Sequence, residues 1–525
     1  MRFQWKGRTY HFTCLPFELV SAPREFMLIM KPIMSFLRRL GVRLLIYLDD
    51  IILFNQDEHK LITDMNTLSY MLLNLGFTIN TKKSVTTPSR QMEFLGMLID
   101  SESMQMQLPQ DKVSNILSQC MDLKTKKEVS VHRLAQVIGK LSSTVQAILP
   151  APLFYRQMQM QKAKALVATK SYESMVTLND ASREELEWWT DHLQSWNGRA
   201  IISPGPDMVI QTDASKTGWG AFVEGQPRSK GLSGLWSQNE TRSQINLLEL
   251  KAAEFAVRAL TKNKSNLHIH LKMDNRSALV YINKLGGTRS QSLVQATKSL
   301  WQYCMTKGIT LSAEYLPGEQ NGIADALSRH HKDSSNWKLE RTVFQQLNRR
   351  WGPFRMDLFA DRLDTQLPMF RSWRPDPQAH GTDAFLTEWD KSCYAFPPFC
   401  MIGRCLSKVK RDRTEITLIA PMWQSQHWFP SLLDLLQDHP ILLPDSRELL
   451  QDPKGLPHPM IGGNRLRLAA WRLSGDPDKT KVFLETLPSS CPRDGEDRHD
   501  ELTTLPGIGG QVGAWKGKLI RFKRL

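Results

Sequence analysis

The pattern of apolar and polar positions divides the chain into strand-like and helix-like segments. Near the N-terminus, in the segment from Arg43 to Phe54, two apolar runs flank an acidic pair, Asp49 and Asp50. Short apolar runs on either side of a polar turn predict a β-hairpin. From about residue 108 to residue 199, apolar residues recur every three or four positions, which predicts a helical region.

A break at Pro204-Gly205-Pro206 precedes a segment that contains both the period-two alternation of strands and the periodicity of helices. Residues 208–213 and the run that starts at Gly220 have strand character. Apolar residues then fall on one face of a helix (Ile245, Leu248, Ala252, Phe255 and Ala259), and residues 267–273 alternate with period two. The full segment predicts three strands, a helix, a strand, two helices, a strand and a final helix.

Four acidic residues occupy related places in this segment. Asp213 ends the first strand, Glu249 lies just off the apolar stripe of the helix, Asp274 follows the alternating strand, and Asp325 belongs to the last helix. Acids from two strands and two helices can converge on one small pocket, where bound cations would offset their repulsion. Each acid alone would be an ordinary surface residue. The ordered set predicts a metal site.

The acidic pair at the N-terminal hairpin is a second candidate site. Two carboxylates at the tip of an apolar hairpin are costly unless a cation or solvent neutralises them. Asp49 and Asp50 therefore indicate a divalent-metal site that handles phosphates. The alternative is an ordinary Asp-rich β-turn.

Size, charge and cysteine usage narrow the class of protein. A length of 525 residues favours three to four domains. The formal net charge of +15 favours a polyanionic partner, with nucleic acid ahead of anionic membranes. The 7 cysteines are scattered and form no metal-binding or disulfide spacing. No signal peptide or membrane span is evident, so we expect an intracellular protein of the cytoplasm or nucleus.

The N-terminal motifs resemble those of reverse transcriptases. The resemblance rests on residues 12–26, on Tyr47-Leu-Asp-Asp50, on residues 75–84 and on residues 92–97. It implies that Asp49 and Asp50 hold catalytic metal in a palm domain. It also implies that a template-primer or nucleotide lies near a set of residues that comprises Tyr47, Lys82, Lys83, Phe94 and Gly96. The first catalytic aspartate of that family is expected before Met1, so the polymerase site is expected to be incomplete.

The motifs around the four acids resemble ribonuclease H type 1. This resemblance implies that Asp213, Glu249, Asp274 and Asp325 bind Mg²⁺ or Mn²⁺ and hydrolyse the RNA strand of RNA–DNA hybrids. Ser215, Asn246 and Asn275 would contact the nucleic acid, and the alternative for each is a role in a helix cap or turn.

Residues 350–444 weakly resemble the adenine methyltransferase domain of DIRS-type retrotransposons. In active enzymes, the residue before the Pro-Pro-aromatic turn is Asn or Asp, which accepts hydrogen bonds from the target amine. Phe396 stands there in this chain and cannot accept one. We therefore expect a degenerate methyltransferase-like module, or alternatively a plain α/β packing module.

Together these features resemble a fragment of a DIRS-type reverse transcriptase and ribonuclease H polyprotein. The predicted fold is multidomain, α/β and α+β, with oligomeric state left open. Its segments are a truncated reverse transcriptase palm (1–100), a helical thumb and connection (101–203), a ribonuclease H domain (204–332), a methyltransferase-like module (350–444), and a linker and tail (445–525). The first functional hypothesis is a nuclease. The alternatives are a catalytically decayed nucleic-acid-binding protein and a polymerase completed by a partner or longer product.

Overall fold

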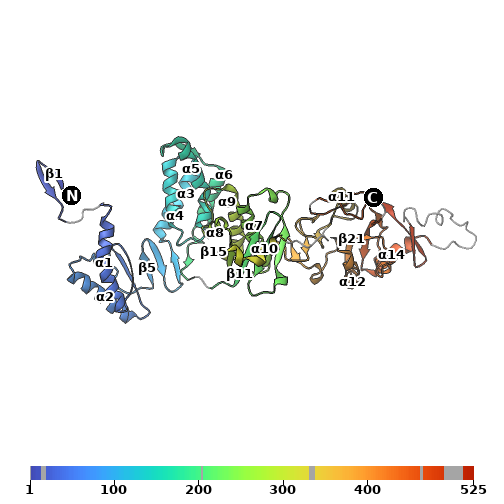
Figure 1. Cartoon of the computed structure of the whole chain (residues 1–525), viewed down its shortest axis with the longest axis horizontal. Coiled ribbons are helices and arrows are strands. Elements are labelled where there is room, and N and C mark those ends of the chain that lie inside the picture. Colours follow the sequence, from blue (N-terminus) through green and yellow to red (C-terminus); the bar gives the residue numbers. More distant parts are fainter. Residues whose placement is uncertain are drawn as a thin grey trace, which may run out of the picture. The chain divides into compact units, whose positions relative to one another are not determined.

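The computed structural model describes residues 2–13, 19–202, 205–329, 337–453, 455–461, 465–489 and 512–525 (Figure 1). The chain forms two compact units, residues 1–204 and 205–525.

The predicted hairpin of the first unit packs against two helices. Strands β3 (Arg43–Tyr47) and β4 (Asp50–Phe54) pair in antiparallel register, and α1 (Ala22–Arg39) and α2 (Glu58–Asn74) cover one face of the pair. The other face is open to solvent, since Leu45 on that face is 55% exposed. Before α1, strands β1 (Arg2–Trp5) and β2 (Arg8–His11) form a separate exposed hairpin.

A four-stranded antiparallel sheet crosses the boundary that the sequence placed at residue 100. Its order is β10-β7-β6-β5, built from β5 (Gln91–Phe94), β6 (Met97–Asp100), β7 (Gln105–Gln107) and β10 (Arg199–Ala200). A division between residues 100 and 101 would separate β6 from its partner β7, so that boundary is wrong. Strand β10 pairs with β7 although the two lie almost 100 positions apart in the chain, a pairing that local periodicity cannot indicate.

The helical region predicted from residue 108 is present. Its elements are α3 (Gln110–Thr125), β8 (Glu128–Ser130), α4 (Val131–Ser143), α5 (Arg156–Thr169), β9 (Met175–Thr177) and α6 (Asp180–His192). Trp189 is fully buried and its Nε1 donates to the Phe154 carbonyl at 2.8 Å, while the Trp188 ring stacks on Phe154. These tryptophans pack helices together.

The second unit begins with a five-stranded mixed sheet in the order β13-β12-β11-β14-β15. The central β11 (Met208–Ala214) is parallel to β14 (His268–Met273), and β14 is parallel to β15 (Thr310–Tyr315). On the other side, β12 (Gly218–Val223) and β13 (Leu232–Leu235) pair antiparallel.

Helices α7 (Ile245–Leu260), α8 (Arg276–Asn283), α9 (Gln291–Thr306) and α10 (Gly322–Arg329) complete this part of the unit. The elements follow the predicted order along the chain. Helix α7 contacts β11, β12, α8 and α9, so it is buried over most of its surface. Burial on several sides explains why Glu249, although off the apolar stripe, is inside the protein.

The remaining residues build a six-stranded sheet in the order β17-β20-β21-β24-β22-β27. Its strands are β17 (Met356–Asp357), β20 (Cys393–Ala395), β21 (Glu415–Pro421), β24 (Leu468–Ser474), β22 (Ile441–Leu442) and β27 (Lys523–Arg524). The helices are α11 (Arg341–Trp351), α12 (Ile402–Asp412), α13 (Phe429–Asp434) and α14 (Pro477–Thr486). Two-stranded pairs are β16 (Lys338–Leu339) with β23 (Leu450–Gln451), β18 (Arg371–Ser372) with β19 (Gly381–Thr382), and β25 (Val512–Trp515) with β26 (Lys518–Arg521).

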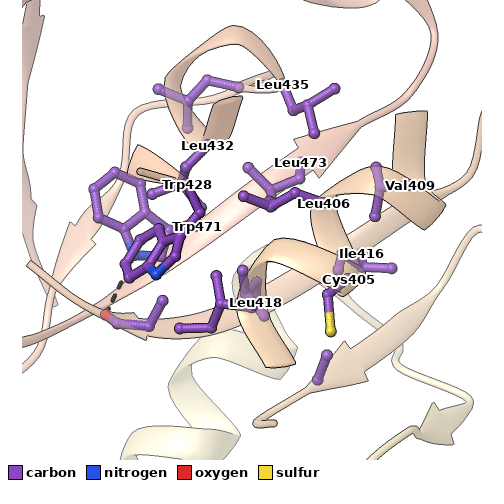
Figure 2. Packing of buried hydrophobic residues seen from close by; sticks show 14 of the residues in the cluster. Cys405, Leu406, Val409, Ile416, Leu418, Trp428, Leu432, Leu435, Trp471 and Leu473 are labelled. Carbon is purple, nitrogen blue, oxygen red and sulfur yellow. Dashed lines mark hydrogen bonds between the residues drawn. The ribbon is translucent and has the colours of Figure 1, made fainter. Parts of the chain in front are cut away.

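Figure 2 shows how helix side chains fill one face of this sheet. Cys405, Leu406 and Val409 of α12 pack with Leu418 and Trp471 of the two central strands. Because these residues are all buried, α12 is fixed against the sheet by its inner face.

The predicted limits of this module, 350–444, are wrong at both ends. Helix α11, which begins before residue 350, contributes Val343 and Leu347 to the buried core. After residue 444, β24 pairs with β21 over seven residues, Glu415–Pro421 against Ser474–Leu468, and is therefore no linker. Strand β24 lies between two strands and is buried on both faces, so it lacks the alternation that marks a half-exposed strand.

Gly220 in β12 lies where α10 approaches the sheet most closely. A Cβ at this position would lie 2.3 Å from the Ala324 carbonyl oxygen and 2.6 Å from the Ser328 nitrogen. We expect Gly220→Ala to lower the free energy of unfolding of the second unit by about 1–3 kcal/mol, because α10 would have to move away from the sheet. Denaturant unfolding monitored by circular dichroism measures the change.

Gly322→Ala is the matched control, since a Cβ on Gly322, at the start of the same helix, meets no atom within 4 Å. Equal stability of the two variants would contradict the close packing of α10 on β12.

Candidate metal centre

Three of the four predicted acids meet at one edge of the five-stranded sheet. Asp213 lies at the end of β11, Asp274 follows β14, and Glu249 comes from α7, which crosses the sheet. One carboxylate oxygen from each of the three lies within 4.8 Å of the other two. Because β11 and β14 are adjacent parallel strands, their carboxyl ends lie at the same edge, and this brings the two aspartates together.

Burial makes this group of acids electrostatically unfavourable when all three are charged. Glu249 is 4% exposed and Asp213 is 5% exposed. Burial, followed by the charges of Asp213 and Asp274, raises the pKa of Glu249 to about 9. Burial also raises the pKa of Asp213, against the opposing effect of a hydrogen bond from Ser328. Without a cation, the group therefore retains a proton at neutral pH.

The buried Glu249 carboxylate has one oxygen without a partner. Its Oε2 is inaccessible to solvent and accepts no hydrogen bond from any described residue. An unpaired buried carboxylate oxygen is costly, and a cation at this point would remove the cost. Carboxylate oxygens are the ligands that hard divalent cations prefer, so the three side chains fit Mg²⁺ or Mn²⁺.

Asp325 lies at the margin of the three-acid group. It is carried by α10, its side chain is 41% exposed, and Arg329 Nε donates to its Oδ1 at 2.6 Å. The Asp325 charge still raises the pKa of both Asp213 and Glu249, so it acts on the same site. The predicted quartet is thus three clustered acids and one that is held by an arginine one turn away.

Sequence reasoning missed Ser328 as a site residue. Its hydroxyl donates to Asp213 Oδ2 at 2.7 Å and orients that carboxylate. Ser328 lies one helical turn after Asp325. This i to i+3 spacing puts both residues on one face of α10, and it is the signal in the sequence that could have identified Ser328. Asn321, just before α10, donates to the Thr212 carbonyl at 3.0 Å and fixes the start of the helix beside β11.

The three predicted nucleic-acid contacts have structural partners. Ser215 is buried, accepts from the Thr217 and Gly218 amides and donates to the Ser328 carbonyl at 2.7 Å, so it is a turn residue that ties β11 to α10. Asn275 caps α8 by accepting from the Ala278 amide, and its Nδ2 donates to Asn246 Oδ1 at 2.9 Å. The cap and turn alternatives hold for Ser215 and Asn275. Contact of Asn246 and Asn275 with nucleic acid stays a prediction.

The acidic pair of the first unit lies in a different environment from the one expected. Asp49 and Asp50 are both exposed, and among the described residues they belong to no group of three potential metal ligands. Solvent can therefore neutralise the pair without a cation, because one face of the β3–β4 hairpin is open to solvent and Tyr47 is 58% exposed. Leu48, at the turn, has φ 55°, a conformation that non-glycine residues rarely adopt.

The other predicted polymerase residues lie on two further segments. Lys82 and Lys83 are exposed in an irregular stretch after α2. Phe94 ends β5, and the turn that follows has positive φ at Leu95 (50°) and Gly96 (69°), as two-residue hairpins require. Lys112 Nζ donates to the Gly96 carbonyl at 2.7 Å and holds this turn against α3.

A search of the described helices for a membrane span found none with sufficient length and apolar character.

Comparisons of sequence relate the chain to polyproteins of viruses. It is 22% identical over 341 residues to polyprotein P3 of Commelina yellow mottle virus, which covers 62% of this chain and 16% of that protein. It is 24% identical over 363 residues to the genome polyprotein of Petunia vein clearing virus (isolate Shepherd), which covers 66% of this chain and 15% of that protein. The chain thus spans about a sixth of the length of these curated relatives.

Among solved structures, a foamy viral protease-reverse transcriptase in complex with dsDNA matches with a TM-score of 0.34 and 15% identity, over 60% of this chain and 62% of that one. The same viral protein in complex with an RNA/DNA hybrid matches with a TM-score of 0.34 and 14% identity, over 60% and 40% of the two chains. In sequence, residues 1–99 match the family Reverse transcriptase (RNA-dependent DNA polymerase). The chain therefore carries a reverse transcriptase domain in residues 1–99 and has homologues among viral polyproteins.

Proposed function

We propose that residues 205–329 form a ribonuclease H that hydrolyses the RNA strand of RNA–DNA hybrids with the help of Mg²⁺ or Mn²⁺. The convergence of Asp213, Glu249 and Asp274, with an unpaired Glu249 oxygen among them, carries this proposal. We further propose that the chain is part of a retrotransposon polyprotein of the DIRS type, in which the nuclease follows a reverse transcriptase domain and acts inside the cell.

The side chains of the site have separable roles in this reaction. Asp213, Glu249 and Asp274 would hold divalent cations, which supply charge neutralisation, activation of water and stabilisation of the leaving 3′ oxygen. Ser328 keeps the Asp213 carboxylate in place. Asp325, whose charge acts on Asp213 and Glu249, would be the fourth ligand once its contact with Arg329 opens. Two of these ligands, Asp213 and Glu249, are buried, and Asp274 is nearer to the surface.

Partly exposed amides next to the acids are suited to contact the hybrid. The Asn246–Asn275 pair comes from the N-terminal ends of α7 and α8, three residues before Glu249 and one after Asp274. Amide groups can donate to and accept from ribose 2′-hydroxyls, which distinguish RNA from DNA. Nearby, the Arg276 guanidinium lies 4.8 Å from the centre of the Tyr315 ring and presents a cation beside the same edge. These groups would select the RNA strand.

Replacement of one ligand carboxylate tests the nuclease directly. We expect Asp274→Asn to reduce cleavage of a labelled RNA–DNA hybrid in Mg²⁺ by about 10³-fold or more, because an amide cannot provide the negative charge that holds the cation. Denaturing gel electrophoresis of the RNA strand measures the rate.

Glu314→Gln on β15 is the matched control. It makes the same acid-to-amide change in the same domain, at an exposed residue that pairs with Lys272. Wild-type protein that binds the hybrid in a salt-sensitive manner but leaves it uncut would favour the alternative, a catalytically decayed nucleic-acid-binding protein.

The raised pKa of Glu249 gives a test that does not depend on turnover. In metal-free protein, the native state holds a proton on Glu249 up to about pH 9, while the unfolded chain releases it near its ordinary pKa of 4.5. Native protein therefore binds more protons than unfolded protein between these values, and its stability falls as pH rises through this window. Glu249→Gln has no such proton to lose.

We expect the Tm of Glu249→Gln in a chelator, relative to wild type, to increase from about pH 5 to about pH 9. Added Mg²⁺ should raise the Tm of wild type more than that of the variant, and more at high pH, since cation binding displaces the proton. Differential scanning calorimetry measures both. A Tm difference that does not vary with pH, together with equal Mg²⁺ effects on the two proteins, would argue against a buried ligand at Glu249.

DNA polymerisation is a second candidate function, favoured by the family match over residues 1–99. Asp49 and Asp50 would hold the catalytic cations, and a template-primer would lie along Tyr47, Lys82, Lys83 and the Phe94–Gly96 turn. Among the described residues, no third acid completes the Asp49–Asp50 pair. Two-metal chemistry needs carboxylates from more than one place, so this function requires an acid from another segment or chain.

We expect the 525-residue chain alone to extend a labelled primer on an RNA template no faster than its Asp49→Asn variant. A polymerase assay with both proteins measures this. Extension by wild type that the substitution abolishes would show that the described residues are sufficient.

A further inference from the structure

A basic groove lies in the C-terminal module, on elements that do not contribute to the three-acid group. It has a volume of about 1320 Å³ and is bordered by α12, α13, α14 and the β25–β26 hairpin. None of the residues from 205 to 329 lines this groove. The groove is therefore a separate feature from the candidate nuclease.

The walls of the groove are fixed by the hydrophobic core. Leu406 of α12 and Leu435, which follows α13, line the groove and also belong to the buried cluster beneath it. Both are visible among the packed side chains in Figure 2. Because the inner faces of these helices are anchored, their outer side chains are held in a constant arrangement.

Positive charge dominates the lining. Seven lysine and arginine residues line the groove against two acids, Asp434 and Glu485. Some of this charge is compensated, since Lys408 and Arg411 both contact Asp412, and Lys516 contacts Asp434 at 2.6 Å. These contacts leave other cations on the rim free of short ion pairs.

Three exposed cations on α12 and α14 form no ion pair shorter than 4.0 Å with any described residue. Lys481 is 75% exposed on its side chain and lies 4.0 Å from Glu485, at the limit of an ion pair. Lys410 is exposed, and no ion pair joins it to another described residue. The exposed Arg404 guanidinium lies over the Phe385 ring at 4.1 Å, which orients it without neutralising it. The three side chains are available to bind anions.

The dimensions of the groove favour an extended polyanion over a small anion. Pockets for small ligands have volumes of about 300–1,000 Å³, and this groove is larger. A hollowed surface also fits a strand better than it fits a flat membrane. Cations along a groove, with apolar and aromatic groups on its floor, are the features by which proteins hold nucleic-acid backbone.

We propose that this groove, lined by Arg404, Lys410 and Lys481, is a second nucleic-acid-binding site that holds the sugar-phosphate backbone at a distance from the nuclease centre. It would bind through phosphate contacts and without sequence preference, because the exposed groups are cations and not base-reading amides. Such a site would keep the chain on its substrate between successive cleavage events.

Charge reversal on the full chain tests the proposal. Arg404→Glu, Lys410→Glu and Lys481→Glu are combined, and binding to labelled single-stranded and duplex DNA of about 20 nucleotides is measured by fluorescence anisotropy over a range of NaCl concentrations. Neither probe contains RNA, so cleavage does not interfere. We expect at least a tenfold loss of affinity at low salt, and a decrease of about 2–3 in the slope of log affinity against log salt. The probe that loses more affinity identifies which form of nucleic acid the groove holds.

The matched control reverses three exposed cations of the same module that do not line the groove, by Arg341→Glu, Arg349→Glu and Lys391→Glu. The control has the same net charge as the test variant, so a general electrostatic effect would appear equally in both. Equal losses in the two variants, or no loss in the groove variant, would overturn the proposal. Loss of binding to phosphatidylserine vesicles with DNA binding unchanged would also overturn it and assign the groove to a membrane.

A second variant keeps the test decisive if charge reversal prevents folding. Arg404→Gln, Lys410→Gln and Lys481→Gln remove the three charges without adding acids, and a thermal melt like that of wild type confirms the fold. We expect this variant to show the same decrease in salt slope with a smaller loss of affinity, because it lacks the repulsion. An unchanged slope in a folded variant would exclude phosphate contacts at these residues.

Discussion

The repulsion among Asp213, Glu249 and Asp274 is the constraint on which the second unit depends. Two adjacent parallel strands and a buried helix bring their carboxylates together in a place with little solvent. Desolvation and like charge both favour protonation there, and this appears in the raised pKa of Glu249 and Asp213. A globular protein without a use for cations gains nothing from such an arrangement, because apolar residues would pack there at lower cost.

The surrounding contacts hold this costly group in one geometry. Gly220 allows α10 to approach β12, and the approach brings Ser328 within hydrogen-bond distance of Asp213. Further out, the largely buried Arg362 of the C-terminal module donates to the Leu235 carbonyl and to Glu240 Oε2 at 2.8 Å, close to the start of α7. The helix that carries Glu249 is therefore supported both by its own sheet and by the module that follows. The support explains why residues 205–525 form one compact unit.

The two acidic sites of the chain differ in what their surroundings impose. At Asp49 and Asp50, solvent reaches the carboxylates and supplies the neutralisation that burial would otherwise demand from a cation. At Glu249, solvent is excluded and an oxygen remains unpaired. Carboxylate side chains thus have an ordinary environment in one place and an electrostatically unfavourable one in the other. Burial, and not the presence of paired acids, separates the stronger metal-site candidate from the weaker one.

The sequence by itself determined the local elements and the identity of the acids. Periodicity of 2 and 3.6 residues was sufficient for the β3–β4 hairpin, the helical region and the element order from β11 to α10, because each depends on neighbours a few residues apart. It was insufficient for β24, whose two buried faces remove the alternation, and for the β10–β7 pairing, which joins distant residues. Only the tertiary structure decided that Glu249 is buried and that Ser328 contacts Asp213. These are contacts between elements, and no local pattern in the sequence encodes the distances between elements.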